Sequence, residues 1–146
     1  RELEARYEIR NEIFLKKVQI EARVLGDLAI NHIIPTAIAY QNILISNVKG
    51  LKELFPKEYE KLANHQLNLL QEISEHIHEI RKQVDEMIEY RKEANLVEDV
   101  VERAHLYAKK VRPYIEDIRY HIDKLEMIVD DEMWPLPKYR EMLFIR

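Results

Sequence analysis

Apolar residues recur along most of this chain at alternating steps of three and four, the spacing of helices that pack through one face. The first such stretch covers residues 7–48, and a proline, Pro35, interrupts it without ending it. A helix of roughly 40 residues spans about 60 Å and needs partner helices to bury its apolar row. We therefore predict one long first helix. Its apolar row is Val18, Ala22, Leu25, Ala29, Ile33, Ile38, Ile43 and Leu44.

Two further stretches carry the same pattern and supply those partners. The second has its apolar positions at Leu62, Leu70, Ile73, Ile77, Ile80, Val84 and Met87. The third has them at Val97, Val101, Ala104, Ala108, Val111, Ile115, Ile118, Ile122, Leu125 and Val129. Asn95 is expected to cap the third helix, with Glu98 completing a capping box. Because the connection is short, the two helices are expected to be antiparallel neighbours.

The fold class predicted from these stretches is all-α, a long antiparallel three-helix bundle in up-down-up order. The helices are expected at about 2–48, 56–93 and 96–131, so that the bundle occupies residues 1–131. Pro35 and Pro113 should each kink their helix, since proline removes a backbone donor and clashes with the preceding turn. Gly50, within the turn expected over Ser46–Pro56, suits a left-handed cap. Gly26 is expected where the backbone crosses close to a neighbouring helix.

The last residues, 132–146, have a different character and are expected to form a tail. Trp134-Pro135-Leu136-Pro137 cannot continue a helix, because each proline favours extended geometry in the residue before it. The tail is predicted to pack on the bundle or on a neighbouring domain through its apolar side chains, which include Tyr139, Met142, Leu143 and Phe144. Just before it, Asp130, Asp131 and Glu132 crowd the predicted end of a helix, where negative charge is unfavourable. We hypothesise a basic partner surface for this acidic cluster.

Composition and charge narrow the choice of partners. The chain has 146 residues, a net charge of −4 and no cysteine, with basic residues scattered in pairs rather than along one face. A nucleic-acid partner is therefore not expected, and the absence of cysteine suits a cytoplasmic protein. No apolar run approaches the ~18 residues of a membrane span, so no membrane partner is expected. The chain begins within a helical pattern at Arg1, and we expect it to be a piece of a larger protein.

One arrangement of residues requires a test for chemistry. Bundles that hold two metal ions use Glu-x-x-His pairs on two helices, and this chain has Glu75…His78 and Glu102…His105. At 100° per residue, however, Glu75 lies roughly 170° from the centre of the apolar row. An antiparallel hairpin also displaces the two pairs by about 14 Å along the axis, whereas bridged ions lie about 4 Å apart. We therefore predict no metal site here.

The remaining histidines, His32, His65, His76 and His121, are interpreted as structural or surface residues. No serine–histidine arrangement and no glycine-rich phosphate loop is present. We assign no catalytic, cofactor-binding or metal-binding residue to the chain.

Two segments nevertheless resemble a known family. Ile20-Glu21-Ala22-Arg23 followed by Asn31-His32-Ile33-Ile34-Pro35 is similar to the C-terminal region of type III glutamine synthetases. So is Lys124-Leu125-Glu126 leading through Asp130-Asp131-Glu132-Met133-Trp134-Pro135-Leu136-Pro137-Lys138-Tyr139 to Leu143-Phe144. The order and spacing of both segments match, and the resemblance covers essentially the whole chain.

The resemblance implies a parent enzyme that joins ammonia to glutamate through a γ-glutamyl phosphate, using ATP and Mg²⁺ or Mn²⁺. It implies a dodecamer of two stacked rings, with the catalytic groups in upstream domains, so that this fragment binds none of these cofactors and is inactive alone. The expected role is structural, in packing against the catalytic domains of the same chain or against other subunits. The overhang expected around Tyr7 to Ile13 would then join the bundle to the catalytic domains.

Two other interpretations stay open from the sequence. A free-standing helical bundle that acts as a protein-interaction module would show the same apolar rows. A metal-dependent bundle oxidase would need the paired Glu-x-x-His motifs to converge. The sequence preceding Arg1 would separate the first from the synthetase interpretation, and metal analysis would test the second.

Overall fold

The computed structural model describes residues 2–138 and 141–142, and within them every regular element is helical. The elements are α1 (Glu2–Leu28), η1 (Ala29–Ile33), α2 (Ile34–Leu54), α3 (Tyr59–Leu62), α4 (Asn64–Asn95), α5 (Val100–Leu106), η2 (Tyr107–Val111) and α6 (Arg112–Ile128). The all-α prediction is confirmed for these residues.

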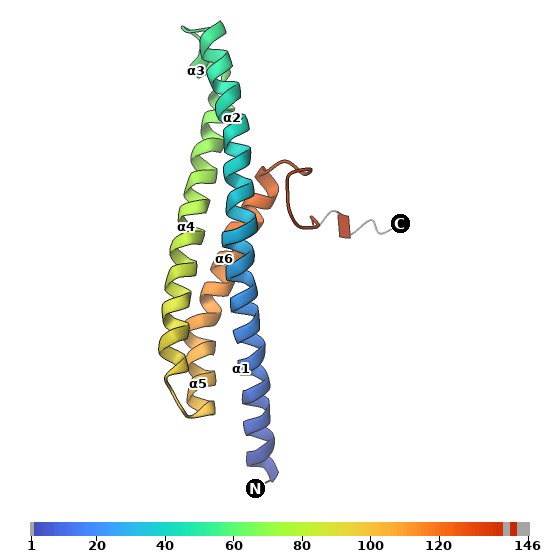
Figure 1. The fold of residues 1–146 in the computed structure, drawn as a ribbon, viewed down its shortest axis with the longest axis vertical. Helices are drawn as coiled ribbons and strands as arrows, with labels where there is room; N and C mark the ends of the chain where they lie inside the picture. The colour runs from blue at the N-terminus through green and yellow to red at the C-terminus, as the bar shows by residue number, and fades with distance from the viewer. Residues whose placement is uncertain (1, 139–140, 143–146) are drawn as a thin grey trace.

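Figure 1 shows α1, η1 and α2 as one continuous column that rises from the N-terminus. The chain then descends through α4, which packs along α2 and α6, and rises again through α5 and α6, which lie against α1. The segment after α6 leaves the column sideways (Figure 1). The buried core follows the line where these helices meet, and its largest fully buried side chains are Tyr107, Ile33, Ile73, Ile80, Met87, Ile118, Leu125, Val84 and Val111.

The first helix is longer than predicted, and the turn expected over Ser46–Pro56 is wrong for most of its length. Helix α2 continues to Leu54, and Gly50 is helical with no positive φ. The reason is that Val48 and Leu51, both half-buried, prolong the apolar row beyond the buried Leu44 at helical spacing. Phe55 then leaves the helix with φ −131° and ψ 63°, since a following proline disfavours helical geometry in the residue before it.

The second and third helices begin later than predicted. Residues 56–63 contain only the short α3, and the long helix α4 starts at Asn64. Asn95 is the last residue of α4 rather than a cap, and the expected Asn95–Glu98 capping box is wrong. Asp99 caps α5 instead, because its Oδ1 accepts from the backbone N–H of Glu102 at 2.7 Å. The final long helix ends at Ile128, three residues before the predicted boundary.

Both internal prolines follow a π-helical turn. The N–H of Ile34 donates to Ala29 O and that of Arg112 donates to Tyr107 O, each five residues back. Such wider turns accommodate a proline that cannot donate to the carbonyl four residues earlier. The predicted kinks thus fall beside altered helical turns, and their bend angles stay predictions.

The π turns also change which residues are buried. In the last helix, Tyr107 is fully buried where Ala108 was predicted, and Ala108 is exposed. In the first helix, Ala37 takes the core position after Pro35, while Ile38 and Ile43 are 45% and 54% exposed. A π turn shifts the register of an apolar row by about one residue, which a constant helical period does not reproduce.

Gly26 does not mark a close crossing of two backbones. A Cβ placed on it would meet only side-chain atoms, Val84 Cγ1 and Met87 Cε, each at 3.7 Å. These are ordinary van der Waals distances, so the expectation of a close backbone approach is corrected.

The continuous helix Glu2–Leu54 contains one 18-residue window with a mean hydropathy of 1.3, enough by length and composition for a membrane span. The prediction that no apolar stretch approaches the length of a membrane span is therefore corrected. One such helix is weak evidence for a membrane, because the core helix of a water-soluble bundle meets the same criteria; 22% of the window is buried here.

Candidate functional site

The paired Glu-x-x-His motifs lie on the outside of the bundle. Glu75 and His78 are exposed on α4, and Glu102 and His105 are exposed on α5. Within residues 2–138 and 141–142, no three histidine or acidic side chains lie close enough to hold one metal ion. The structure does not bring the two motifs together into one centre.

Two of the other histidines do meet. His76 on α4 and His121 on α6 lie 45 residues apart in sequence, yet their Nδ1 atoms are 2.9 Å apart and their ring centroids 5.2 Å apart. At this distance one ring can donate its Nδ1–H and the other accept it, so one hydrogen bond joins the two rings. The pair bridges two helices that pack along each other. Sequence reasoning missed it because no local spacing relates the two positions.

The charges around the pair act in both directions. Burial lowers the pKa of His121, and His76 lowers it further, while Glu79 and Asp117 act to raise it. Glu72 Oε1 lies 3.8 Å from His76 Nε2, and the ring of Tyr120 meets that of His121 edge-on. The dominant effect is burial, which favours the neutral imidazole at His121.

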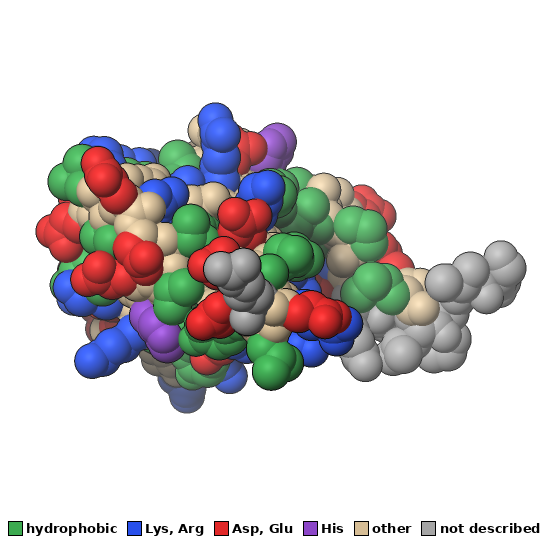
Figure 2. Space-filling view, turned by 90° about the horizontal axis from the view of Figure 1, so that it is seen from below, with side chains coloured by type: hydrophobic (Ala, Val, Ile, Leu, Met, Phe, Trp, Pro, Cys, Tyr) green, Lys and Arg blue, Asp and Glu red, His purple; other side chains and the backbone are tan. Residues whose placement is uncertain are grey.

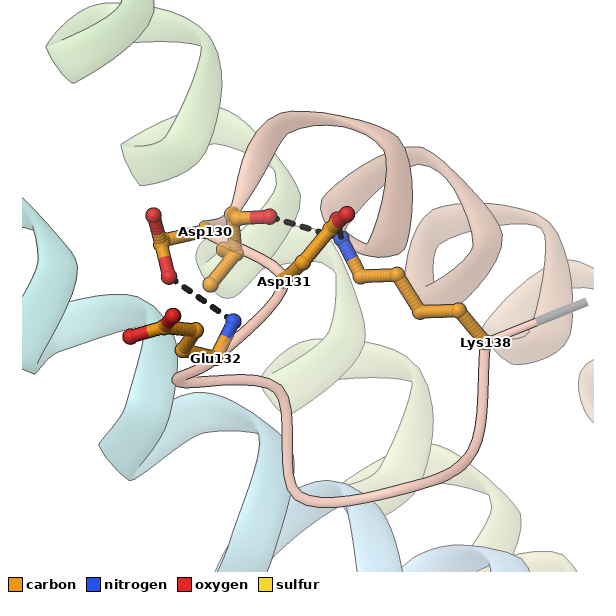
Figure 3. Close-up of polar contacts among 5 residues, drawn as sticks. Asp130, Asp131, Glu132 and Lys138 are labelled. Atoms are coloured by element: carbon orange, nitrogen blue, oxygen red, sulfur yellow. Dashed lines mark hydrogen bonds and ion pairs between the residues drawn. The ribbon is translucent and has the colours of Figure 1, made fainter. Parts of the chain in front are cut away.

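The acidic cluster after α6 is largely engaged within its own chain (Figure 3). Asp130 Oδ1 accepts from the backbone N–H of Glu132 at 2.8 Å, which forms a tight turn. Asp131 Oδ1 accepts from Lys138 Nζ at 2.6 Å, and the same ammonium donates to Val129 O at 2.8 Å. Because α6 ends at Ile128, these carboxylates lie beyond the helix. A basic group therefore does meet the cluster, but it belongs to this chain.

This contact folds the beginning of the tail back onto the bundle. Lys138 is 9% exposed and Trp134 is 6% exposed, and Trp134 belongs to the same hydrophobic cluster as the helices. The Lys138 ammonium lies 5.9 Å from the centre of the Trp134 ring. Trp134 Nε1 is buried with no acceptor among the described residues. The predicted apolar contacts of Tyr139, Leu143 and Phe144 lie outside the described residues, and Met142 is 55% exposed.

The N-terminal end of α1 presents apolar side chains to solvent. Residues 2–10 are all exposed, and the first buried side chain is Leu15. Leu3, Tyr7, Ile9 and Ile13 are among the exposed large apolar residues. Figure 2 looks at the molecule from this end, where hydrophobic side chains lie at the surface among charged ones.

The comparisons with known proteins all lead to glutamine synthetases. Residues 1–52 match the family model of the glutamine synthetase C-terminal domain. The chain is 52% identical over 146 residues to a glutamine synthetase of Bacteroides fragilis (strain YCH46) and 32% identical over 149 residues to a type-3 glutamine synthetase of Dictyostelium discoideum. A glutamine synthetase of Butyrivibrio fibrisolvens is 24% identical over 143 residues. Each match covers 98% or 99% of this chain and 20% of the relative.

All regular elements among the described residues are helical. The chain spans one fifth of the length of the relatives that it matches. The chain is therefore similar to glutamine synthetases, and its first 52 residues match their C-terminal domain.

Proposed function

We propose that this chain is the C-terminal domain of a type III glutamine synthetase, whose full polypeptide makes glutamine from glutamate, ammonia and ATP. The observation that carries the proposal is 52% identity to a glutamine synthetase along 99% of the chain. The assignment to type III is supported by 32% identity to a relative of that type over the same extent.

We propose that the domain acts by packing rather than by chemistry. Its helices and its tail would form one antiparallel unit of three long columns, and this unit would pack against the catalytic domains or between subunits. The exposed apolar end of α1 supports this role, since large exposed apolar surfaces on soluble proteins usually mark contacts.

The parent enzyme's Mg²⁺ or Mn²⁺ and ATP are proposed to bind in its other domains. Among the described residues of this chain, no three acidic or histidine side chains lie close enough to hold one metal ion. We also propose a dodecameric, cytoplasmic parent enzyme without nucleic-acid or membrane partners.

The proposal is tested on the full-length protein purified from its source gene. Glutamine formation should depend on glutamate, ammonia, ATP and a divalent cation together, and should be absent when any one is left out. A full-length protein that folds and forms no glutamine under these conditions would contradict the proposal. Glutamine formation by residues 1–146 alone would contradict the assignment of a packing role.

A further inference from the structure

Helix α1 carries a second apolar row on the side that faces away from the bundle. Ile9, Ile13, Ile20 and Val24 follow one another at steps of four, seven and four, and each is between 52% and 64% exposed. The buried row of the same helix consists of Leu15, Val18 and Ala22. Helix α1 is thus apolar on two faces, and only one of them is covered by this chain.

The two rows lie on opposite sides of the helix. At about 100° per residue, the four exposed side chains fall within about 60° of one another and roughly 180° from the buried row. Scattered single apolar residues on a surface need no partner, whereas four exposed apolar side chains on one face of a helix indicate a contact. The row begins on the overhang, at Ile9 and Ile13, and continues alongside the bundle at Ile20 and Val24.

We propose that this outer row of α1, Ile9, Ile13, Ile20 and Val24, docks into an apolar groove with an acidic rim in the preceding part of the same polypeptide. The inference rests on the proposed function and deepens it by naming the contact face and the chemistry of its partner.

The length of the relatives favours the preceding part of the same polypeptide as the partner of this row. They carry about four-fifths of their length outside the matched segment, since the match covers 20% of each. In a C-terminal domain the preceding polypeptide joins at the start of α1, next to Ile9 and Ile13. A row that starts near that junction and continues alongside the bundle is placed to hold the domain against what precedes it.

Positively charged side chains beside the row indicate that the partner groove would be acidic at its rim. Lys16, Lys17 and Arg23 flank it, all three are exposed, and none of them has an ion pair with a carboxylate among the described residues. An acidic rim on the partner surface would pair with these cations. Complementary charge at the edge of an apolar contact fixes its register.

Charged side chains on α1 disfavour two other partners of the row, a second copy of the chain and a membrane surface. In a symmetric antiparallel contact with a second copy through this row, Lys16 and Lys17 would lie beside the midpoint of the row on both copies and approach their equivalents. A membrane surface would have to accept Asp27, which lies at the same helical angle as Ile9, close to the lipid chains.

The test uses the full-length enzyme with Ile13→Asp and Ile20→Asp, made singly. Met127→Asp on α6 is the matched control, because Met127 is 80% exposed and lies outside the row. Amide hydrogen exchange is measured over residues 8–27 together with the mass of the oligomer. We expect exchange in this stretch to rise about tenfold or more in both row variants, with no change in the control and no change in oligomer mass.

A second measurement keeps the proposal testable if a row variant fails to fold. Oligomers of the unmodified enzyme are mixed from ¹⁴N and ¹⁵N subunits and treated with a zero-length carbodiimide cross-linker. We expect cross-links within one subunit, between Lys16 or Lys17 and acidic side chains of the preceding domains. Cross-links between unlike-labelled subunits, or a loss of oligomer mass in the row variants, would identify a second copy and overturn the proposal. Unchanged exchange would overturn it too, as would binding to anionic vesicles that the row variants lose. Because none of these readouts uses ligase activity, a failure here is distinct from a failure of the proposed function.

Discussion

At the scale of single residues, several polar groups form contacts that the sequence pattern does not predict. His76 and His121 form a hydrogen bond between two helices, and Lys138 binds both a backbone carbonyl and a carboxylate. Each contact joins segments that are distant in the chain or lie beyond the helices. These groups matter because a buried donor or acceptor left without its partner is costly.

The histidine pair makes the stability of the bundle sensitive to acid. The pKa of His121 is lowered from its ordinary value of 6.5, first by burial and then by His76. The unfolded chain therefore binds the proton more readily than the folded chain. The contribution of this group is present above pH 6.5 and is lost as the pH falls through the lowered pKa. Unfolding by urea at pH 7.5 and at pH 5 should show lower stability at the acidic pH.

Two variants check the origin of that acid sensitivity. His121→Phe should weaken the difference between the two pH values, because the group that titrates is removed. His78→Gln on α4 is the control, since His78 is exposed and outside the pair. An equal pH dependence in the wild type and in His121→Phe would show that other groups cause it.

Lys138 should hold the tail on the bundle. In Lys138→Ala, Val129 O and Asp131 lose their charged donor, which we expect to cost about 1–2 kcal/mol of stability. Trp134 is the only tryptophan in the chain, so its fluorescence reports the tail directly. The emission should shift to longer wavelength as Trp134 gains exposure to water. Lys109→Ala, at an exposed position of η2, is the control and should leave the emission unchanged. If Lys138→Ala and Lys109→Ala give the same emission spectrum, this role of Lys138 is contradicted.

At the scale of elements, the apolar period predicted the long helices and most of their buried residues. It could not predict the π turns, where Tyr107 and Ala37 take the core positions in place of Ala108 and Ile38. It also placed a turn at Gly50, because glycine favours turns, although the helix continues past it to Leu54. The period describes how one helix repeats, whereas helix ends and register shifts depend on what the neighbouring helices contact. The histidine pair is missed for the same reason.

The two glycines give a test at this scale. Both are helical without positive φ, and a Cβ on Gly26 would make only ordinary contacts, while one on Gly50 would meet nothing within 4 Å. Gly26→Ala and Gly50→Ala should each stabilise the chain by up to about 1 kcal/mol, since glycine is the weaker helix former. Urea unfolding measures the change. A loss of stability in Gly26→Ala alone would show that Val84 and Met87 cannot tolerate the added methyl group.

At the scale of the whole molecule, one polar group connects three segments that the sequence analysis kept apart. Asn95, at the end of α4, accepts through Oδ1 from the Tyr107 hydroxyl at 2.8 Å and from Gln19 Nε2 of α1 at 3.3 Å. Tyr107 is fully buried in η2. The residue expected to cap a helix instead joins the first, second and third long columns at the lower end of the bundle in Figure 1.

Asn95→Ala should therefore destabilise the whole bundle by about 1–3 kcal/mol, because the buried Tyr107 hydroxyl loses its acceptor. Tyr107→Phe should cost less, since Asn95 is exposed and can turn to water. Once the hydroxyl is gone, removing Asn95 as well should add little, so the double variant should lie close to Tyr107→Phe. Urea unfolding of the four proteins measures this coupling, and additive losses in the double variant would show that Asn95 and Tyr107 act independently. A coupled pair would mean that the helical end nearest the α1 overhang is fixed by a buried hydrogen bond as well as by apolar packing.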